Sequence, residues 1–246
     1  IYRANNNRGF SAEESIERIK RQQEETGAKA IKFKIGGRRS IPERPTGRTE
    51  RLIPMVREHF GDDVTIYADC NGSYDAEKAI RIGKLLQENR IDLFEQPVPT
   101  DWYEDWKITA DALTIPIASG GGEVSLRCFR WLIGNDAVQM VQQDLFYFGG
   151  MIRCMKVARM AAAKGCVCTP HISGTGLGYI YMMQFVSAIA NAGPYHEFKG
   201  LSNDVPFECK TSSLKPDDGI LHLPKGVGSG VEIAPDFIAK HKPVRA

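Results

Sequence analysis

The stretch Val64-Thr-Ile-Tyr-Ala-Asp-Cys-Asn-Gly72 is a mostly apolar run that ends in a carboxylate, an amide and a glycine. Its β-branched and aromatic residues favour a buried strand, and Gly72 breaks the run. Asp69 and Asn71 therefore lie at the carboxyl end of a predicted strand. The partner of the Asp69 carboxylate decides how the rest of the chain is interpreted.

Charged and ionisable residues recur at the ends of other apolar runs. They are Lys34, Glu95, Asp144, His171 and Glu197. Most intervals in this series are about 26 residues, and the longest contains a further apolar run, Ile115–Ser119, so the period is that of one strand plus one helix. Strand ends in such a βα array converge on one mouth. The sequence therefore predicts an α/β barrel with these side chains at its mouth.

Composition excludes several classes of protein. The chain has 246 residues and a net charge of +2 from 32 basic and 30 acidic residues, so neither a nucleic acid nor a membrane is an expected partner. The six cysteines include no Cys-x-x-Cys pair, which favours reduced thiols and a cytoplasmic protein. Because the sequence starts at Ile1, inside a strand-like run, we expect it to be a piece of a longer chain.

Local patterns place the remaining elements. Ala30–Ile35 alternates with a period of two, which puts Lys32 and Lys34 on one face. Two lysines on a central strand must face a polar cavity, although an exposed edge strand would also accommodate them. The aperiodic stretch Gly36–Arg48 is predicted to be a long loop at the mouth. The predicted helices include Ala12–Thr26, Asp75–Glu88, Trp102–Ala112, Leu126–Ile133, Gly150–Lys164 and Gly178–Asn191.

Two pairs of residues carry candidate chemistry. Asp69 and Glu95 would repel each other at adjacent strand ends unless a cation lies between them, and all-oxygen ligation suits Mg²⁺. The alternative is that each carboxylate caps a following helix. Asp144 and His171 can form a hydrogen bond across neighbouring strands, which fixes the imidazole tautomer for a general base. A purely structural histidine is the alternative there.

Five motifs, in this order and spacing, together resemble the barrel domain of the enolase superfamily, mandelate racemase subgroup. They are Ile31-Lys-Phe-Lys34, Ala68-Asp-Cys-Asn71, Phe94-Glu-Gln-Pro97, Gln143-Asp-Leu-Phe146 and Pro170-His-Ile-Ser-Gly174. The resemblance covers most of residues 1–200. It implies a (β/α)₇β barrel of the TIM type, a Mg²⁺ cofactor and abstraction of the proton α to a carboxylate.

The resemblance also implies roles for single residues. Asp69 and Glu95 match metal ligands, Lys34 matches one base, and Lys32 matches its electrostatic partner. The Asp144–His171 pair matches the acid/base on the other face. Glu197 matches a carboxylate that hydrogen-bonds the substrate, and Asn71 is a predicted substrate-binding residue.

Two features depart from the family pattern. In the family, the third metal ligand is a Glu that follows the fifth strand. In this sequence the spacing puts Gly121 at the matching position, and the nearest carboxylate is Glu123. Either Glu123 reaches the ion through a rearranged loop, or water takes its place. The N-terminal capping domain of the family is absent from the sequence. The expected organisation is a barrel over 1–200 and a C-terminal segment over 201–246 that covers it.

The resemblance predicts an acid-sugar dehydratase that forms a 2-keto-3-deoxy acid from a small carboxylate substrate. A racemase or epimerase of 2-hydroxy acids would use the same bases. A catalytically impaired barrel acting as a binding module stays open, because Gly121 replaces a ligand. A Schiff-base aldolase using Lys34 is a further alternative, which the paired carboxylates disfavour. A homo-oligomer is expected.

Overall fold

Strands and helices alternate along the chain. The structure, a computed structural model, describes residues 1–39, 41–200 and 205–241. The first eight strands are β1 (Tyr2–Ala4), β2 (Ala30–Lys34), β3 (Thr65–Asp69), β4 (Leu93–Glu95), β5 (Ile117–Ser119), β6 (Met140–Val141), β7 (Val167–Cys168) and β8 (Glu197–Phe198). The helices between them are α1 (Ala12–Glu24), α2 (Arg48–Phe60), α3 (Ala76–Glu88), α4 (Tyr103–Ala112), α5 (Leu126–Gly134), α6 (Met151–Ala162) and α7 (Leu177–Ser187).

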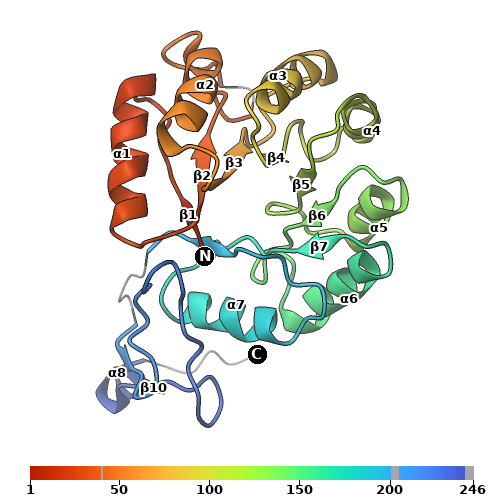
Figure 1. Cartoon of the computed structure of the whole chain (residues 1–246). Coiled ribbons are helices and arrows are strands. Elements are labelled where there is room, and N and C mark those ends of the chain that lie inside the picture. Colours follow the sequence, from red (N-terminus) through yellow and green to blue (C-terminus); the bar gives the residue numbers. More distant parts are fainter. Residues whose placement is uncertain (40, 201–204, 242–246) are drawn as a thin grey trace.

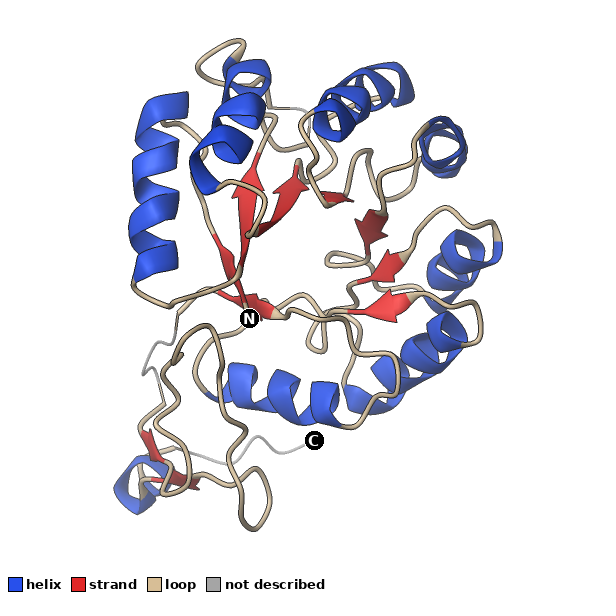
Figure 2. Ribbon diagram, viewed as in Figure 1, coloured by secondary structure: helices blue, strands red, loops and turns tan. Residues whose placement is uncertain are grey.

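The eight strands form one parallel sheet in the order β7-β6-β5-β4-β3-β2-β1-β8. Figure 2 shows them curving around a centre, with the helices on the outside. An isolated parallel bridge joins Cys168 of β7 to Ala192, just before β8. One helix follows each of the first seven strands, and among the described residues the next element after β8 is a strand. The predicted (β/α)₇β barrel is confirmed.

Strand register brings the charged residues to one level. Lys34 of β2 is paired with Asp69 of β3, and Asp69 is paired with Glu95 of β4. Neighbouring strands lie about 4.8 Å apart, so these three side chains start from adjacent positions at the carboxyl ends of their strands. The alternation predicted for β2 also holds, because Ile31 and Phe33 join the core under the helices.

A separate apolar cluster fills the inside of the barrel below these charges. Its buried members are Tyr2, Ala4, Ala30, Tyr67, Leu93, Ala118 and Met140. The Tyr2 ring lies 5.1 Å from the Lys32 ammonium nitrogen and forms the floor beneath it. The barrel interior is therefore packed rather than open, and the polar site lies above this layer.

Several element boundaries differ from the prediction, and two of the differences have a clear physical reason. Helix α7 ends at Ser187, short of the predicted Asn191. The reason is that Asn191 instead joins β7: its carbonyl accepts the N–H of Cys168 at 2.8 Å, and its side chain donates to the Cys166 carbonyl at 2.9 Å. Strand β5 begins at Ile117 rather than Ile115, because Pro116 has no N–H for a ladder.

The described part of the C-terminal segment lies beside α7 (Figure 1). It contains the antiparallel pair β9 (Phe207–Glu208) and β10 (Glu232–Ile233), and the short helix α8 (Pro235–Ala239). Gln184 of α7 donates to the carbonyl of Ser229 at 3.3 Å, which ties the segment to the barrel. Residues 201–204 and 242–246 of the predicted segment lie outside the described residues. The division at residue 200 stays a prediction.

His196, just before β8, makes stability depend on pH. Burial lowers the pKa of His196 from 6.5 to about 4, so between these values the unfolded chain binds a proton that the folded chain does not. Stability therefore falls as the pH drops through this range. We expect the free energy of unfolding, measured with urea, to decrease less from pH 6.5 to 4 in His196→Gln than in the wild type. The slope of this free energy against pH should change by an amount that corresponds to at most about one proton. His59→Gln, on an exposed position of α2, serves as the matched control, and equal slopes in the two variants would contradict the prediction.

Candidate active site

The Lys32 ammonium lies at the centre of a buried charge cluster. Its nitrogen is 2.9 Å from Glu95 Oε2, 3.0 Å from Glu197 Oε1 and 3.8 Å from Asp69 Oδ2. Burial alone would lower the pKa of Lys32, but the carboxylates of Glu197 and Glu95 outweigh it and raise this pKa well above its usual value. Lys32 is therefore a fixed positive charge rather than a base.

Lys34 has the opposite character. Its nitrogen donates to Asp69 Oδ2 and lies 3.2 Å from Asn71 Oδ1. Burial lowers the pKa of Lys34, and the positive charge of Lys32 acts in the same direction, while Asp69 opposes it. A lysine with a lowered pKa is more easily deprotonated near neutral pH, as a general base requires.

The two candidate metal ligands have pKa shifts in opposite directions. Burial and the neighbouring Asp69 charge raise the pKa of Glu95. Burial would also raise the pKa of Asp69, but Lys34 and Lys32 lower it below its usual range. Gln142 donates to Glu95 Oε2 at 2.8 Å. The carboxylates are stable here because cationic and amide donors surround them.

The donor set fits Mg²⁺ as a two-carboxylate site. Asp69 and Glu95 share a register position on adjacent strands, and they are contacted by Lys32, Lys34 and the amides of Asn71 and Gln142. No group of three or more His, Cys, Asp or Glu side chains in the described residues is arranged to hold a metal ion. Mg²⁺ commonly takes one or two carboxylates and completes its shell with water and substrate oxygens, and such a site is compatible with this pair.

Glu123 does not join this pair. Its Oε1 accepts the backbone N–H groups of Val124 at 2.8 Å and Ser125 at 2.5 Å, immediately before α5. Gly121, by contrast, lines the cavity, and a Cβ added there would lie 3.1 Å from the His171 ring. Glu123 as a metal ligand stays a prediction, and in this conformation the carboxylate is engaged elsewhere.

Asp144 and His171 form the predicted pair across β6 and β7. Asp144 Oδ2 lies 2.8 Å from His171 Nδ1, and Asp144 Oδ1 accepts the N–H groups of Phe146 and Tyr147. Burial would raise the pKa of Asp144, but the hydrogen bonds from His171 and Tyr147 outweigh it and lower this pKa. The ionised carboxylate holds the ring through Nδ1, which leaves Nε2 for chemistry.

Glu197 connects the two halves of the site. Besides Lys32, it accepts the Ile172 N–H at 2.9 Å, and its Oε2 lies 4.0 Å from His171 Nε2. Burial would raise the pKa of Glu197, but Lys32, followed by His171 and Lys199, lowers it below its usual range. Glu197 is therefore ionised and can accept a hydrogen bond from a ligand.

The sequence interpretation missed two cations. Lys199 Nζ lies 3.4 Å from Glu197 Oε2 and 3.5 Å from His171 Nε2. It follows Glu197 by two positions, so strand alternation could have placed it on the same face. Arg8 donates to Asn71 Oδ1 at 2.8 Å. Asn71 itself has a positive φ of 49° and lines the cavity, but Arg8 follows no strand-end pattern that would have revealed it.

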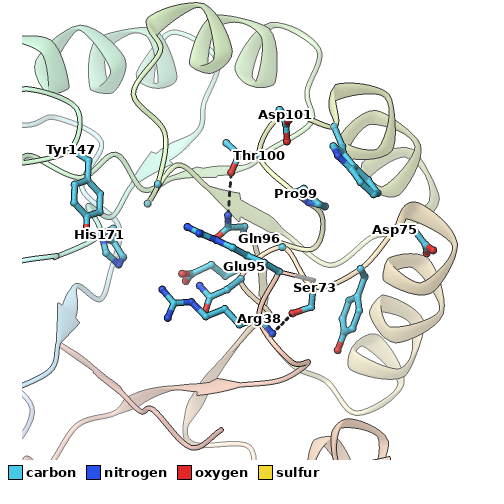
Figure 3. A pocket seen from close by; sticks show the side chains of 17 residues that line it. Arg38, Ser73, Asp75, Glu95, Gln96, Pro99, Thr100, Asp101, Tyr147 and His171 are labelled. Carbon is cyan, nitrogen blue, oxygen red and sulfur yellow. Dashed lines mark hydrogen bonds between the residues drawn. The ribbon is translucent and has the colours of Figure 1, made fainter. Parts of the chain in front are cut away.

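Of the site residues, Asn71, Glu95, Gly121 and His171 line a cavity of about 700 Å³ at the barrel mouth. Figure 3 shows Glu95 and His171 on one side of it, and Thr100, Asp101 and Asp75 farther out. The cavity is also lined by Arg38, Arg39 and Tyr147. The predicted loop at Gly36–Arg48 thus contributes to the mouth, as expected, with residue 40 outside the described part.

Comparison with known proteins agrees with this geometry. Residues 14–237 match the family model described as enolase C-terminal domain-like, and the chain belongs to this family. Arabinonate dehydratase of Saccharolobus solfataricus is 30% identical over 236 residues, which cover 95% of this chain and 61% of that protein. The resemblance drawn from the five motifs is confirmed.

The fold of this chain also matches solved structures closely. A Roseobacter denitrificans structure provisionally named a racemase has a TM-score of 0.87 and 32% identity, covering 97% of this chain and 66% of that chain. A mandelate racemase/muconate lactonizing protein from Paracoccus denitrificans PD1222, complexed with magnesium, has a TM-score of 0.85 and 25% identity, covering 97% of this chain and 64% of that one. The chain thus spans less than two thirds of each relative. No helix in its described part has the length and apolar character needed to cross a membrane.

The metal site yields a test with four variants. We expect Asp69→Asn and Glu95→Gln each to weaken Mg²⁺ binding at least about tenfold, because each removes a charged donor. Glu123→Gln should leave binding unchanged, since the Glu123 carboxylate accepts the N–H groups of Val124 and Ser125 just before α5. Gly121→Glu should tighten binding by adding a carboxylate to the cavity. Isothermal calorimetry measures all four.

Loss of Mg²⁺ binding in Glu123→Gln would show that this carboxylate moves to the ion. Unchanged binding in both Asp69→Asn and Glu95→Gln would remove the proposed site altogether. Melting temperatures of the variants serve as the control for folding.

Proposed function

We propose that this barrel removes the proton α to a carboxylate and completes the reaction as an acid-sugar dehydratase, a hydro-lyase. One observation carries the proposal. A lysine with a lowered pKa ends β2, and a histidine held by an ionised aspartate follows β7, so the two groups lie well apart around the ring and both at the carboxyl ends of strands.

The first step is proton removal from carbon. Lys34 takes the proton from one face of the substrate and His171 takes it from the other, according to the configuration of the α-carbon. The C–H electron pair moves toward the carboxylate, where negative charge grows. Lys32 lies beside that charge as a buried cation that cannot dissociate from its three carboxylates and so stabilises it electrostatically.

The second step is loss of the β-hydroxyl. His171, protonated at Nε2, donates its proton to the departing oxygen, the C–O bond breaks, and water leaves. The resulting enol tautomerises to a 2-keto-3-deoxy acid. Asp144 keeps the imidazole oriented through both steps, and Glu197 accepts a hydrogen bond from a substrate hydroxyl.

Asp69 and Glu95 would hold Mg²⁺, which supplies Lewis-acid stabilisation of the substrate carboxylate when bound. Because the protein would provide two carboxylates here, oxygens of the substrate and of water would supply the other ligands. The substrate is accordingly a small carboxylate, and an acid sugar supplies both the acidic α-carbon and the β-hydroxyl that the two steps need.

Racemisation is the second candidate, and the presence of two bases favours it. Proton removal by Lys34 and return by His171 would invert the α-carbon without loss of hydroxide. The two reactions share the first step and differ only in the fate of the intermediate. Product analysis by NMR distinguishes a 2-keto-3-deoxy acid from an inverted 2-hydroxy acid.

Exchange of the α-proton with deuterated water tests the shared step directly. We expect His171→Asn to lower the rate of α-proton exchange at least about 100-fold for one α-configuration. Lys34→Ala should lower this rate to the same extent for the other configuration. Asp144→Asn should behave like His171→Asn, because an unoriented imidazole is a poor base. Mg²⁺ binding should persist in His171→Asn and Asp144→Asn, since neither residue is a proposed ligand.

Equal exchange in the wild type and His171→Asn, for substrates of both configurations, would leave Lys34 as the one base. Absence of exchange in the wild type, across a panel of acid sugars with Mg²⁺, would reject the proposed function in favour of a binding module.

A further inference from the structure

The loop after β2 places two arginines at the cavity in an unfavourable backbone conformation. Arg38 has φ of 91° and Arg39 has φ of 53°, a region that side chains other than glycine seldom adopt and that costs free energy. Neighbouring backbone hydrogen bonds hold the conformation: the Arg38 N–H donates to Ser73 Oγ at 2.9 Å, and the Arg39 N–H donates to the Asn71 carbonyl at 3.1 Å. Strain at a cavity wall indicates a functional constraint.

The charges of these arginines are not neutralised within the described part of the chain. Lys32, Lys34 and Lys199 each have a carboxylate partner, whereas no described carboxylate forms a salt bridge with Arg38 or Arg39. Both arginines nevertheless line the cavity. The Arg38 side chain extends along the cavity toward Glu95 (Figure 3). The mouth therefore carries two positive charges without a described carboxylate partner, next to the Lys32 cluster, in which lysines and carboxylates are paired.

The acidic residues of the same cavity do not remove this excess. Glu95 is bound by Lys32, and Asp75 accepts the Lys78 N–H as the N-cap of α3. Asp75 and Asp101 lie at the outer rim, on the other side of the cavity from the end of the Arg38 side chain (Figure 3). Both arginine side chains are exposed at the mouth, so an anionic group of a ligand in the cavity can pair with them.

We propose that Arg38 and Arg39 form a second anion subsite, and hence that the substrate is an acid sugar with two carboxylates rather than one. This inference rests on the proposed function, in which the first carboxylate lies next to the reacting carbon near Asp69, Glu95 and Lys32. Arginine presents two parallel N–H donors that match a carboxylate. The cavity of about 700 Å³ has room for a six-carbon acid with a charged group at each end.

The test compares binding of six-carbon dicarboxylic acid sugars with binding of the monocarboxylic acid sugars of the same configuration. Calorimetry at constant ionic strength measures affinity, with no dependence on the exchange reaction. We expect at least one dicarboxylate to bind at least about tenfold tighter than its monocarboxylate. Arg38→Gly and Arg39→Gly should each reduce this ratio, and the double variant should bring it close to one, with monocarboxylate affinity little changed.

Glycine is the informative replacement because it accepts the positive φ of both positions. The variants should thus fold, with melting temperatures no lower than that of the wild type, while they lose discrimination. Arg130→Ala is the matched control: Arg130 is an exposed arginine of α5 that does not line the cavity, so its removal should leave the ratio unchanged. An equal loss of ratio in Arg130→Ala would reduce the effect to general electrostatic attraction and overturn the subsite.

Two other outcomes would also overturn it. One is that no dicarboxylate of the panel binds tighter than its monocarboxylate. The other is that 6-phosphogluconate binds tighter than glucarate by an Arg38-dependent margin, which would assign the subsite to a phosphate ester. Since deuterium exchange is measured separately, failure of the subsite with intact exchange leaves the proposed function standing.

Discussion

The ammonium group of Lys32, buried among carboxylates from β3, β4 and β8, is the constraint on which the rest of the site depends. A buried charge is tolerated only when partners surround it, and removal of one partner typically costs about 3–5 kcal/mol. The partners come from strands far apart in sequence, so the balance exists only when the barrel has closed in the correct register. The Lys32 charge is therefore neutralised only when the barrel closes.

This balance divides the mouth into regions with different electrostatic character. Around Lys32 the charges are compensated and fixed, which suits stabilisation of charge that develops during a reaction. The Asp144–His171 pair is held separately in the segments that follow β6 and β7, with His171 partly exposed to the cavity. The loop after β2 adds arginine charge without a described carboxylate partner. A ligand that bridges the regions would meet a fixed cation, a general base and an anion subsite.

Gly121 and Glu123 illustrate how little displacement separates a ligand from a structural residue. Spacing alone places Gly121 at the level of the other strand ends, and the structure agrees, because Gly121 lines the cavity. Two residues later, the Glu123 carboxylate instead accepts the N–H groups of Val124 and Ser125, in the turn just before α5. Whether this carboxylate faces the cavity or the backbone depends on local hydrogen bonds that composition does not reveal.

The sequence by itself determined the barrel and the positions of Asp69, Glu95, Asp144, His171 and Glu197 at its mouth. It could do so because a repeating strand and helix impose a period, and parallel strands all end at one face. The tertiary structure alone decided the direction of Glu123, the contacts of Lys199 and Arg8, and the strained backbone of Arg38 and Arg39. These features lie in loops or depend on partners distant in sequence, so their conformation follows from long-range contacts rather than from local periodicity.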